Sequence, residues 1–318
     1  MKRNILILSV ILVIQVVLSV VVFLPRQNAD SESGLLFPGL SVDEIVQLTV
    51  TNSEGKSLRL RRSDGGWVMP DADDYPASTE AVELVLDQVV ALEAVPLVAR
   101  TASSHTRLQV AGDDFLVRLD LETRESGEYS LYLGSSPSYG MTHVRRGGDS
   151  AVYLADGLSS QDISPTGGTW VDSPYLSVDE AELSRITLEN ANGTFVLMRT
   201  SSSGWTLAGL SEAEEANTGN VNVMVMRATS LTLLEPLGKD ADEAYGLDDP
   251  AAVVTLRVGD EEVTLLVGAH DTEDSTYVVK ASTSDYYARV AGYNVQAFVE
   301  NGREDLVQPP PEEEPTEP

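Results

Sequence analysis

The sequence predicts an α+β protein: two tandem repeats, each mostly antiparallel strands with one main helix, after an N-terminal transmembrane helix. Three observations carry this prediction: a 20-residue uncharged apolar segment, period-two alternation of apolar residues, and matching segments offset by 134–139 positions. The predicted boundaries are 1–26 for the membrane anchor, 27–42 for a tether, 43–175 and 176–306 for the two α+β repeats, and 307–318 for a disordered Pro/Glu tail.

The apolar segment runs from Ile5 to Leu24 and contains no charged residue. A helix of this length spans about 30 Å, the thickness of the hydrocarbon core of a bilayer. Lys2 and Arg3 precede it, and positive residues favour the cytoplasmic side. We therefore expect a single-pass protein of a bacterial cell membrane, with its N-terminus in the cytoplasm and the bulk of the chain outside it.

The alternative for this segment is a cleaved signal peptide. Such a peptide has an apolar region of about 7–15 residues followed by small residues at the cleavage site. The segment here is longer and ends VVVFLPRQ, without a site of that kind. An uncleaved signal anchor is therefore the favoured interpretation, and the absence of cysteine excludes a lipid-modified N-terminus.

Composition excludes several classes of function. The chain has 50 acidic and 21 basic residues, and the part after Leu24 has 50 acidic and 19 basic ones, a formal charge of −31. Such a surface repels phosphate backbones, so no nucleic acid is expected as a partner. With no cysteine and only three histidines, thiol nucleophiles, Cys-ligated zinc and iron–sulfur clusters are excluded.

Each repeat opens with a predicted hairpin followed by a strand that carries Trp. In the first half the strand over 45–50 leads through Gly55 to a return strand over 58–60, and the second half repeats this order over 183–188 and 195–197. Three pairs of residues stand 138 positions apart: Leu48 and Ile186, Gly55 and Gly193, and Trp67 and Trp205.

A helix follows the hairpin in each half. Ser78 is a suitable N-cap for the first helix. Apolar residues follow at steps of 3, 4 and 3, the spacing of one helix face: Val82, Val85, Val89 and Leu92, matched by Val221, Met224, Ala228 and Leu231. Pro96 and Pro236 are expected to end the two helices.

Four strands follow each helix. The predicted pairs are 115–121 with 252–258, 129–134 with 263–268, 142–146 with 276–280, and 152–153 with 287–288. A shared order of this length indicates a gene duplication.

Several motifs together resemble a known family. They are Tyr245-Gly-Leu-Asp-Asp-Pro250, the strand end Leu-Val-Gly268, Tyr-Val-Val279, Ser104-His-Thr-Arg-Leu-Gln-Val110, Val152-Tyr-Leu154 and Trp170-Val-Asp172. The chain resembles the bacterial domain of unknown function family 4340 over about residues 43–305. The resemblance implies a membrane-anchored extracytoplasmic protein, often encoded beside ABC-type transporter and gliding-motility-type components. It supplies no catalytic or ligand-binding residues.

Two acidic segments were tested as calcium loops, which require oxygen ligands at alternating positions and Gly at the sixth. Counted from Asp240, positions five and six are Ala244 and Tyr245. Counted from Asp71, they are Tyr75 and Pro76. The pattern fails in both, so we interpret Asp248-Asp249-Pro250 as a turn before a strand and 71–76 as a loop into the first helix.

Motifs of catalysis and nucleotide binding are incomplete. Ser104 and His105 are interpreted as neighbours on one strand, with side chains on opposite faces, and Gly134-Ser-Ser-Pro-Ser138 lacks the final Gly of a nucleophile elbow. Gly238-Lys239 lacks the other residues of a phosphate loop.

Aromatic and turn residues have structural interpretations. Trp67, Trp170 and Trp205 could form a sugar-stacking platform, but the repeated pair Trp67 and Trp205 is expected to pack in the two cores. Asn192-Gly193-Thr194 is a formal glycosylation triplet that we interpret as a hairpin turn.

The sequence therefore predicts a non-enzymatic, membrane-anchored accessory or interaction protein outside the cytoplasm, associated with an ABC-type transporter or a gliding-motility-type envelope complex. No catalytic, cofactor-binding or metal residue is predicted, and no cofactor or nucleotide. The expected partners are the membrane and membrane-embedded or envelope proteins. The alternative is an extracytoplasmic binding or hydrolytic module that acts on an envelope polymer.

Overall fold

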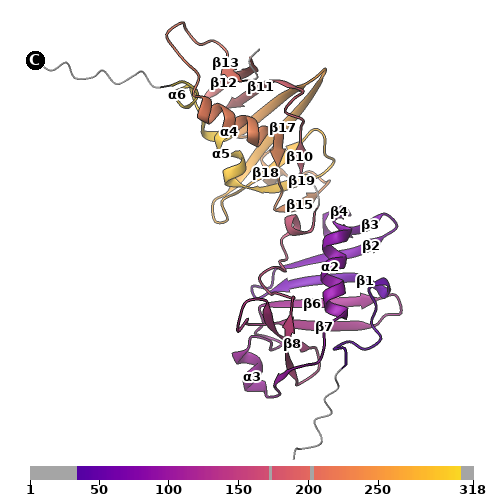
Figure 1. The fold of residues 1–318 in the computed structure, drawn as a ribbon. Helices are drawn as coiled ribbons and strands as arrows, with labels where there is room; N and C mark the ends of the chain where they lie inside the picture. The colour runs from indigo at the N-terminus through magenta and orange to yellow at the C-terminus, as the bar shows by residue number, and fades with distance from the viewer. Residues whose placement is uncertain (1–33, 172–173, 201–203, 309–318) are drawn as a thin grey trace, which may run out of the picture.

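The computed structural model describes residues 34–171, 174–200 and 204–308 (Figure 1). Within them no helix is long and apolar enough to cross a membrane. The predicted anchor over Ile5–Leu24 and residues 309–318 of the predicted tail lie outside the described residues. Val307 and Gln308, which we assigned to the tail, are part of the fold, because the backbone N–H of Gln308 donates to the carbonyl oxygen of Glu215 at 2.8 Å.

The fold is α+β and mostly antiparallel, as predicted, and it forms two lobes (Figure 1). The first lobe, residues 34–171, holds a nine-stranded sheet with helices α2 (Thr79–Val90) and α3 (Ala102–Arg107). Its strands are β1 (Ile45–Asn52), β2 (Ser57–Ser63), β3 (Gly66–Met69), β4 (Tyr75–Ala77), β5 (Leu97–Ala99), β6 (Val117–Thr123), β7 (Glu128–Leu133), β8 (Met141–Arg146) and β9 (Val152–Asp156).

The second lobe, residues 174–308, holds an eight-stranded sheet with helices α4 (Thr218–Thr229), α5 (Gly292–Glu300) and α6 (Arg303–Leu306). Its strands are β11 (Leu183–Asn190), β12 (Gly193–Arg199), β13 (Trp205–Leu207), β15 (Glu235–Gly238), β16 (Ala252–Val258), β17 (Glu261–Asp271), β18 (Thr276–Ala281) and β19 (Tyr287–Ala291). A small separate ladder pairs β10 (Leu176–Ser177) with β14 (Ser230–Leu231). Short 3-10 turns are η1 (Val42–Glu44), η2 (Pro70–Ala72), η3 (Gly167–Trp170) and η4 (Glu243–Tyr245).

Apart from β4, which has no counterpart in the second sheet, the strands of the two sheets follow one order. The first sheet runs β4-β3-β2-β1-β6-β7-β8-β9-β5, and the second runs β13-β12-β11-β16-β17-β18-β19-β15. Register agrees as well, since Leu48 of β1 pairs with Leu60 and Leu121, and Ile186 of β11 pairs with Leu197 and Leu256. The two opening strands each carry an irregularity three residues before these positions, at Ile45 and Leu183.

The predicted helices form, with small differences in their buried faces. The Ser78 hydroxyl accepts from the N–H of Ala81 and caps α2 as predicted, and Asn217 caps α4 in the same way. Val82 and Val89 are buried as predicted, but Leu86 replaces Val85 as the third fully buried residue, and Val85 packs half-buried at the edge of the core. Leu92 and Leu231 are buried beyond the helix ends.

The two prolines do not end the helices. Helices α2 and α4 end at Val90 and Thr229, whereas Pro236 lies inside β15 and Pro96 directly precedes β5. Both strands are sheet edges, and an edge strand tolerates a residue without an N–H group. The prediction was wrong because these short edge strands lack the alternation that marks a strand.

The prediction of one helix in each half was also too simple. Helix α3 occupies a segment interpreted as strand, and α5 follows β19 without a predicted counterpart. Asn190 at the end of β11 holds the C-terminal end of α5 against the sheet, since its Nδ2 donates to the carbonyl oxygens of Phe298 and Asn301 at 2.8 and 2.9 Å.

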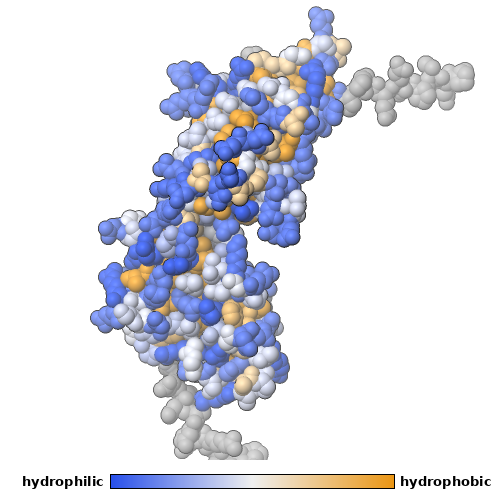
Figure 2. Space-filling view, turned by 180° about the vertical axis from the view of Figure 1, so that it is seen from behind, coloured by the Kyte–Doolittle hydropathy of each residue, from blue (hydrophilic) through white to orange (hydrophobic). Residues whose placement is uncertain are grey.

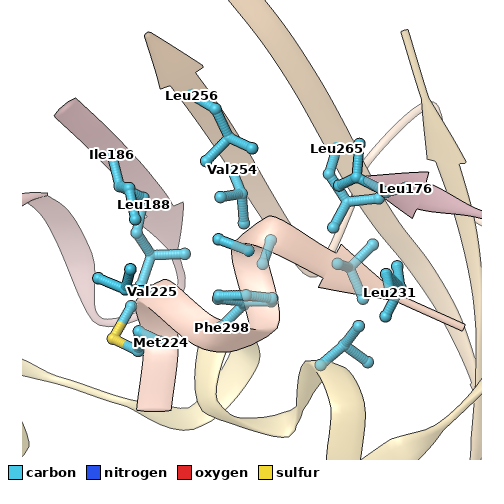
Figure 3. Close-up of a cluster of buried hydrophobic side chains, with 14 of the residues drawn as sticks. Leu176, Ile186, Leu188, Met224, Val225, Leu231, Val254, Leu256, Leu265 and Phe298 are labelled. Carbon is cyan, nitrogen blue, oxygen red and sulfur yellow. The ribbon is translucent and has the colours of Figure 1, made fainter. Parts of the chain in front are cut away.

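One face of each sheet is covered by helices. Strand residues that point to this face are apolar, and those that point to the other face are mostly polar, so the two kinds alternate along each strand. In the second lobe, side chains from β11, β16 and β17 meet Met224 and Val225 of α4 and Phe298 of α5 (Figure 3). Phe298 is fully buried, and the burial of such a side chain contributes about 1.5–3 kcal/mol. The opposite face carries polar residues such as Arg185, Thr187 and Thr255.

Candidate functional site

The first candidate site lies where the lobes meet. Tyr75 of β4 packs edge-on against Tyr286, which precedes β19, with ring centroids 4.7 Å apart. A cavity of about 330 Å³ opens beside this pair and is lined by Tyr75, Pro76, Ala77, Ser78, Val171, Pro174, Ser284 and Tyr286. Burial, and secondarily the neighbouring Tyr286, raise the pKa of Tyr75. None of the described residues that line the cavity is charged, and they offer aromatic rings and hydroxyl groups to a ligand.

Tyr175 anchors the start of the second lobe behind this cavity. Its hydroxyl donates to the carbonyl oxygen of Tyr286 at 2.7 Å and accepts from the N–H of Ala281 at 2.9 Å. Burial is the main reason that the pKa of Tyr175 is raised to about 12. The phenol is therefore neutral at physiological pH, and its hydroxyl links the start of the second lobe to Tyr286 and Ala281.

The acidic loop at residues 71–74 contacts the second lobe through Asp73. Asp73 accepts a hydrogen bond from the backbone N–H of Lys239 in the second lobe at 2.6 Å. Its neighbours form ion pairs within the first lobe: Asp71 with Arg59 at 3.0 Å and Asp74 with Arg61 at 2.7 Å. The three carboxylates have separate protein partners, an arrangement that differs from a shared metal site. The loop also contains η2 and leads into β4, which the sequence interpretation did not foresee.

The second acidic segment forms a local turn. Asp242 caps η4 by accepting from the N–H of Ala244 at 2.8 Å. Within the described residues no group of three or more His, Asp or Glu side chains is placed to hold a metal ion. Leu237 and Gly238 lie in the edge strand β15, and the Lys239 ammonium lies 4.7 Å from the ring centroid of Tyr286. Gly238-Lys239 is thus part of the lobe junction and is not followed by the helix of a phosphate loop.

In each half a glycine at a strand end packs against a loop motif, Gly268 against the Tyr245 motif and Gly134 against the Leu108 motif. A Cβ on Gly268 would collide with the carbonyl oxygen of Tyr245, and a Cβ on Gly134 would collide with that of Leu108. The residue after each of these carbonyls has left-handed backbone geometry, with φ of 62° at Gly246 and 57° at Gln109. The motif residues therefore dock a loop against a strand end, which is a structural role.

Ser104 and His105 lie on helix α3, so their interpretation as strand residues was wrong. The Ser104 hydroxyl lies 2.7 Å from the hydroxyl of Thr101, which caps the helix. His105 Nε2 lies 2.7 Å from the carbonyl oxygen of Ser150. Helix α3 is only six residues long and has no apolar residues at helical spacing, so the hydrophobic periodicity of the sequence did not predict it. Its start is marked by the Thr101 cap alone.

A second cavity lies beside the segment Gly134–Ser138. It measures about 640 Å³ and is lined by Ser136, Ser138, Tyr139, Gly140, Gly157, Ser159, Gln161 and Asp162. The nearby Ser135 hydroxyl lies 3.2 Å from His143 Nδ1, but that nitrogen is 2.6 Å from the carbonyl oxygen of Ser135 and must carry the hydrogen. His143 Nδ1 is therefore a donor and cannot take a proton from Ser135 in this geometry.

The three tryptophans are buried, and the prediction that Trp67 and Trp205 pack in the two cores is confirmed. Trp170 belongs to the first core and donates from Nε1 to the carbonyl oxygen of Ser164 at 2.8 Å. Exposed fractions of 2–6% leave no ring face for a surface platform. The predicted hairpin turn forms between β11 and β12 at Ala191 and Asn192, and Gly193, at φ 130°, is the first residue of β12.

Exposed apolar side chains gather on the helices of the second lobe. Val223 and Met226 of α4 are 44% and 52% exposed, and Tyr293 of α5 is 67% exposed. Arg227 joins the two helices, with its guanidinium 5.4 Å from the Tyr293 ring centroid and a 2.8 Å hydrogen bond to Asn294 Oδ1. The face of the molecule away from these helices is mostly hydrophilic, with apolar patches interspersed (Figure 2).

The fold and its junction define a two-lobed antiparallel α+β protein. The family model described as Domain of unknown function (DUF4340) matches residues 67–235, which is more than half of the chain. The chain therefore belongs to this family, as its motifs indicated. The match extends from β3 of the first lobe to the start of β15 and is shorter than the resemblance over 43–305. No curated protein and no solved structure matches the chain.

Proposed function

We propose that the chain is a single-pass membrane protein whose two lobes act outside the cytoplasm as an accessory or interaction module. The observation that carries the proposal is the uncharged segment Ile5–Leu24 behind Lys2 and Arg3. About 20 apolar residues suffice to span a bilayer. The part that follows has a formal charge of −31, which suits a soluble surface outside the membrane.

The two lobes are proposed to be tandem repeats that arose by duplication, with boundaries at 43–175 and 176–306. The shared strand order and the matching registers of Leu48 and Ile186 support this proposal. Two copies of one sheet joined end to end offer a long surface for protein contacts. Tethering to the membrane raises the effective concentration of that surface near membrane partners.

The proposed partner is an ABC-type transporter or a gliding-motility-type envelope complex. Membership of the family supports this part of the proposal, because the family resemblance implies such an association. The proposal includes no catalysis by the chain itself. It is supported by the donor role of His143 Nδ1 beside Ser135 and by the separate partners of the Asp71–Asp74 carboxylates.

The experiment compares the full-length chain with a variant that lacks residues 1–24 and is exported by a cleavable signal. Crosslinking in intact cells should join the full-length chain to a membrane-embedded protein, and the truncated chain should lose both the adduct and the cellular function. A truncated chain that restores function at the same expression level would refute the anchored role.

A second candidate is an extracytoplasmic module that binds an envelope polymer. The cavity of about 640 Å³ favours it, because serine, tyrosine and glutamine side chains line the cavity and are suited to the hydroxyl groups of a glycan. Binding of purified envelope glycan that is lost in Gln161→Ala would support this candidate. Turnover of that glycan would replace the non-enzymatic proposal.

A further inference from the structure

The strand β5 forms the edge of the first sheet that is farthest from the second lobe. The opposite edge is β4, whose Tyr75 contacts the second lobe. Eight steps between neighbouring strands, at about 4.8 Å each, place the two edges about 38 Å apart. Two large apolar side chains on β5 face solvent, since Leu97 is 44% and Val98 is 42% exposed.

The first described residues reach the fold beside this edge. The carbonyl oxygen of Gly34 accepts from the N–H of Ala94 at 2.9 Å, three positions before Leu97. Leu35 bridges to Glu93 and is 45% exposed, which adds a third apolar side chain. The chain that arrives from Ile5–Leu24 therefore enters the first lobe at the β5 edge.

The charge of this region differs from that of the chain as a whole. Residues 94–112 contain no Asp or Glu but include Arg100, His105 and Arg107. Both arginines are exposed, and neither forms an ion pair within residues 34–171, 174–200 and 204–308. The contact of His105 with Ser150 holds α3 near Val152, which pairs with Ala99 of β5.

We propose that this surface, defined as Leu35, Leu97, Val98, Arg100 and Arg107 and called the β5 edge, rests on an anionic lipid bilayer. The inference depends on the proposed function, because the membrane anchor brings the bilayer into reach. Ten residue steps join Leu24 to Gly34, which gives about 16–19 Å for a flexible chain and at most about 36 Å when extended.

The chemistry of the β5 edge matches that of a membrane surface. Exposed aliphatic side chains enter the boundary between headgroups and acyl chains, and arginines meet phosphate groups. The acid-free segment is flanked by Glu93 before it and by Asp113 and Asp114 after it. Asp149 adjoins Ser150, the partner of His105, and Asp156 lies with Glu93 on the cavity between α2 and β9. The rest of the extracytoplasmic part is strongly acidic and is repelled by anionic lipids, so docking at this edge directs the second lobe away from the bilayer.

The absence of cysteine in the chain allows a test with single introduced thiols. Full-length Val98→Cys is labelled with bimane and reconstituted in phosphatidylethanolamine–phosphatidylglycerol vesicles that contain a lipid spin-labelled at the headgroup. Met198→Cys is the matched control, because Met198 is 42% exposed and lies on β12 in the second lobe. Leu97→Cys is a second probe of the same edge.

We expect the spin label to quench the probe at position 98 or 97 at least twofold more than the probe at position 198. Replacement of phosphatidylglycerol by phosphatidylcholine, or the pair Arg100→Glu and Arg107→Glu, should abolish this difference, because each basic residue near an anionic surface favours the docked state about fivefold. Equal quenching at positions 98 and 198, or quenching at 98 that is unchanged in phosphatidylcholine, would overturn the inference.

Extraction of the vesicles with alkaline carbonate separates the inference from the proposed function. Release of the chain from the vesicles would show that the anchor has failed. Retention of the chain with equal quenching at both positions would leave the anchor in place and refute only the docking of the β5 edge.

Discussion

Replacement of Tyr175 by Phe tests, through a single hydroxyl group, the packing of the second lobe behind the junction cavity. The change removes the hydroxyl that donates to Tyr286 and accepts from the buried Ala281, so one N–H and one C=O lose their partner. An unsatisfied buried polar group costs about 1–3 kcal/mol. We expect the free energy of unfolding to fall by about 2–3 kcal/mol at pH 8.

The free energy of unfolding should also depend on pH differently in the native chain and in Tyr175→Phe. The pKa of Tyr175 is raised from 10.0 to about 12 in the fold, mainly by burial, so the folded state holds its proton more tightly than the unfolded state. The corresponding stabilisation is complete below pH 10 and is lost as pH rises through 12. At about 1.36 kcal/mol per unit, the loss approaches about 2.7 kcal/mol.

The assay is urea unfolding of the detergent-solubilised full-length chain at pH 8, 10 and 11, followed by tryptophan fluorescence. The gap between the native chain and Tyr175→Phe should narrow as pH rises above 10. Tyr139→Phe is the control, because Tyr139 is fully exposed and its loss should change stability little. Parallel pH profiles of the native chain and Tyr175→Phe would refute the account of a buried neutral phenol.

Two further substitutions test the lobe junction and the close approach of a loop to a strand end. Asp73→Ala should lower the free energy of unfolding in urea by about 1–2 kcal/mol, because the backbone N–H of Lys239 loses its charged acceptor, and an unchanged midpoint would contradict the role of Asp73 in the junction. Gly134→Ala should cost more than about 2 kcal/mol in the same assay, because the added Cβ meets the carbonyl oxygen of Leu108. In Gly112→Ala the added Cβ meets only the Tyr132 hydroxyl at 3.9 Å, an ordinary van der Waals contact, and the change should be nearly neutral, so equal effects at the two glycines would contradict the packing argument.

Periodicity was sufficient to predict the long strands and the two main helices. Strands such as β6 and β16 alternate buried and half-buried residues over their first five positions, and the second half repeats the pattern of the first. Ser78 was recognisable because an N-cap has a local chemical signature. These features depend on residues that are close together in the sequence.

The features that sequence missed depend on distant contacts or on very short elements. β4 and β5 have three residues each, too few for a pattern of alternation. Asp73 and Lys239 are 166 positions apart, and nothing in either segment indicates that they meet. Helix α5 has no side-chain cap and no counterpart in the first half, so neither signal identified it.

The topology of the chain in intact cells tests the central proposal most directly. Full-length Met198→Cys carries a single exposed thiol in the second lobe, and a membrane-impermeant maleimide reports whether it lies outside the cytoplasm. The account predicts labelling in intact cells and retention of the labelled chain in the membrane after carbonate extraction, with residues 5–24 still present. A thiol labelled only after the cells are lysed, or a mature chain that begins near Gln27, would contradict it.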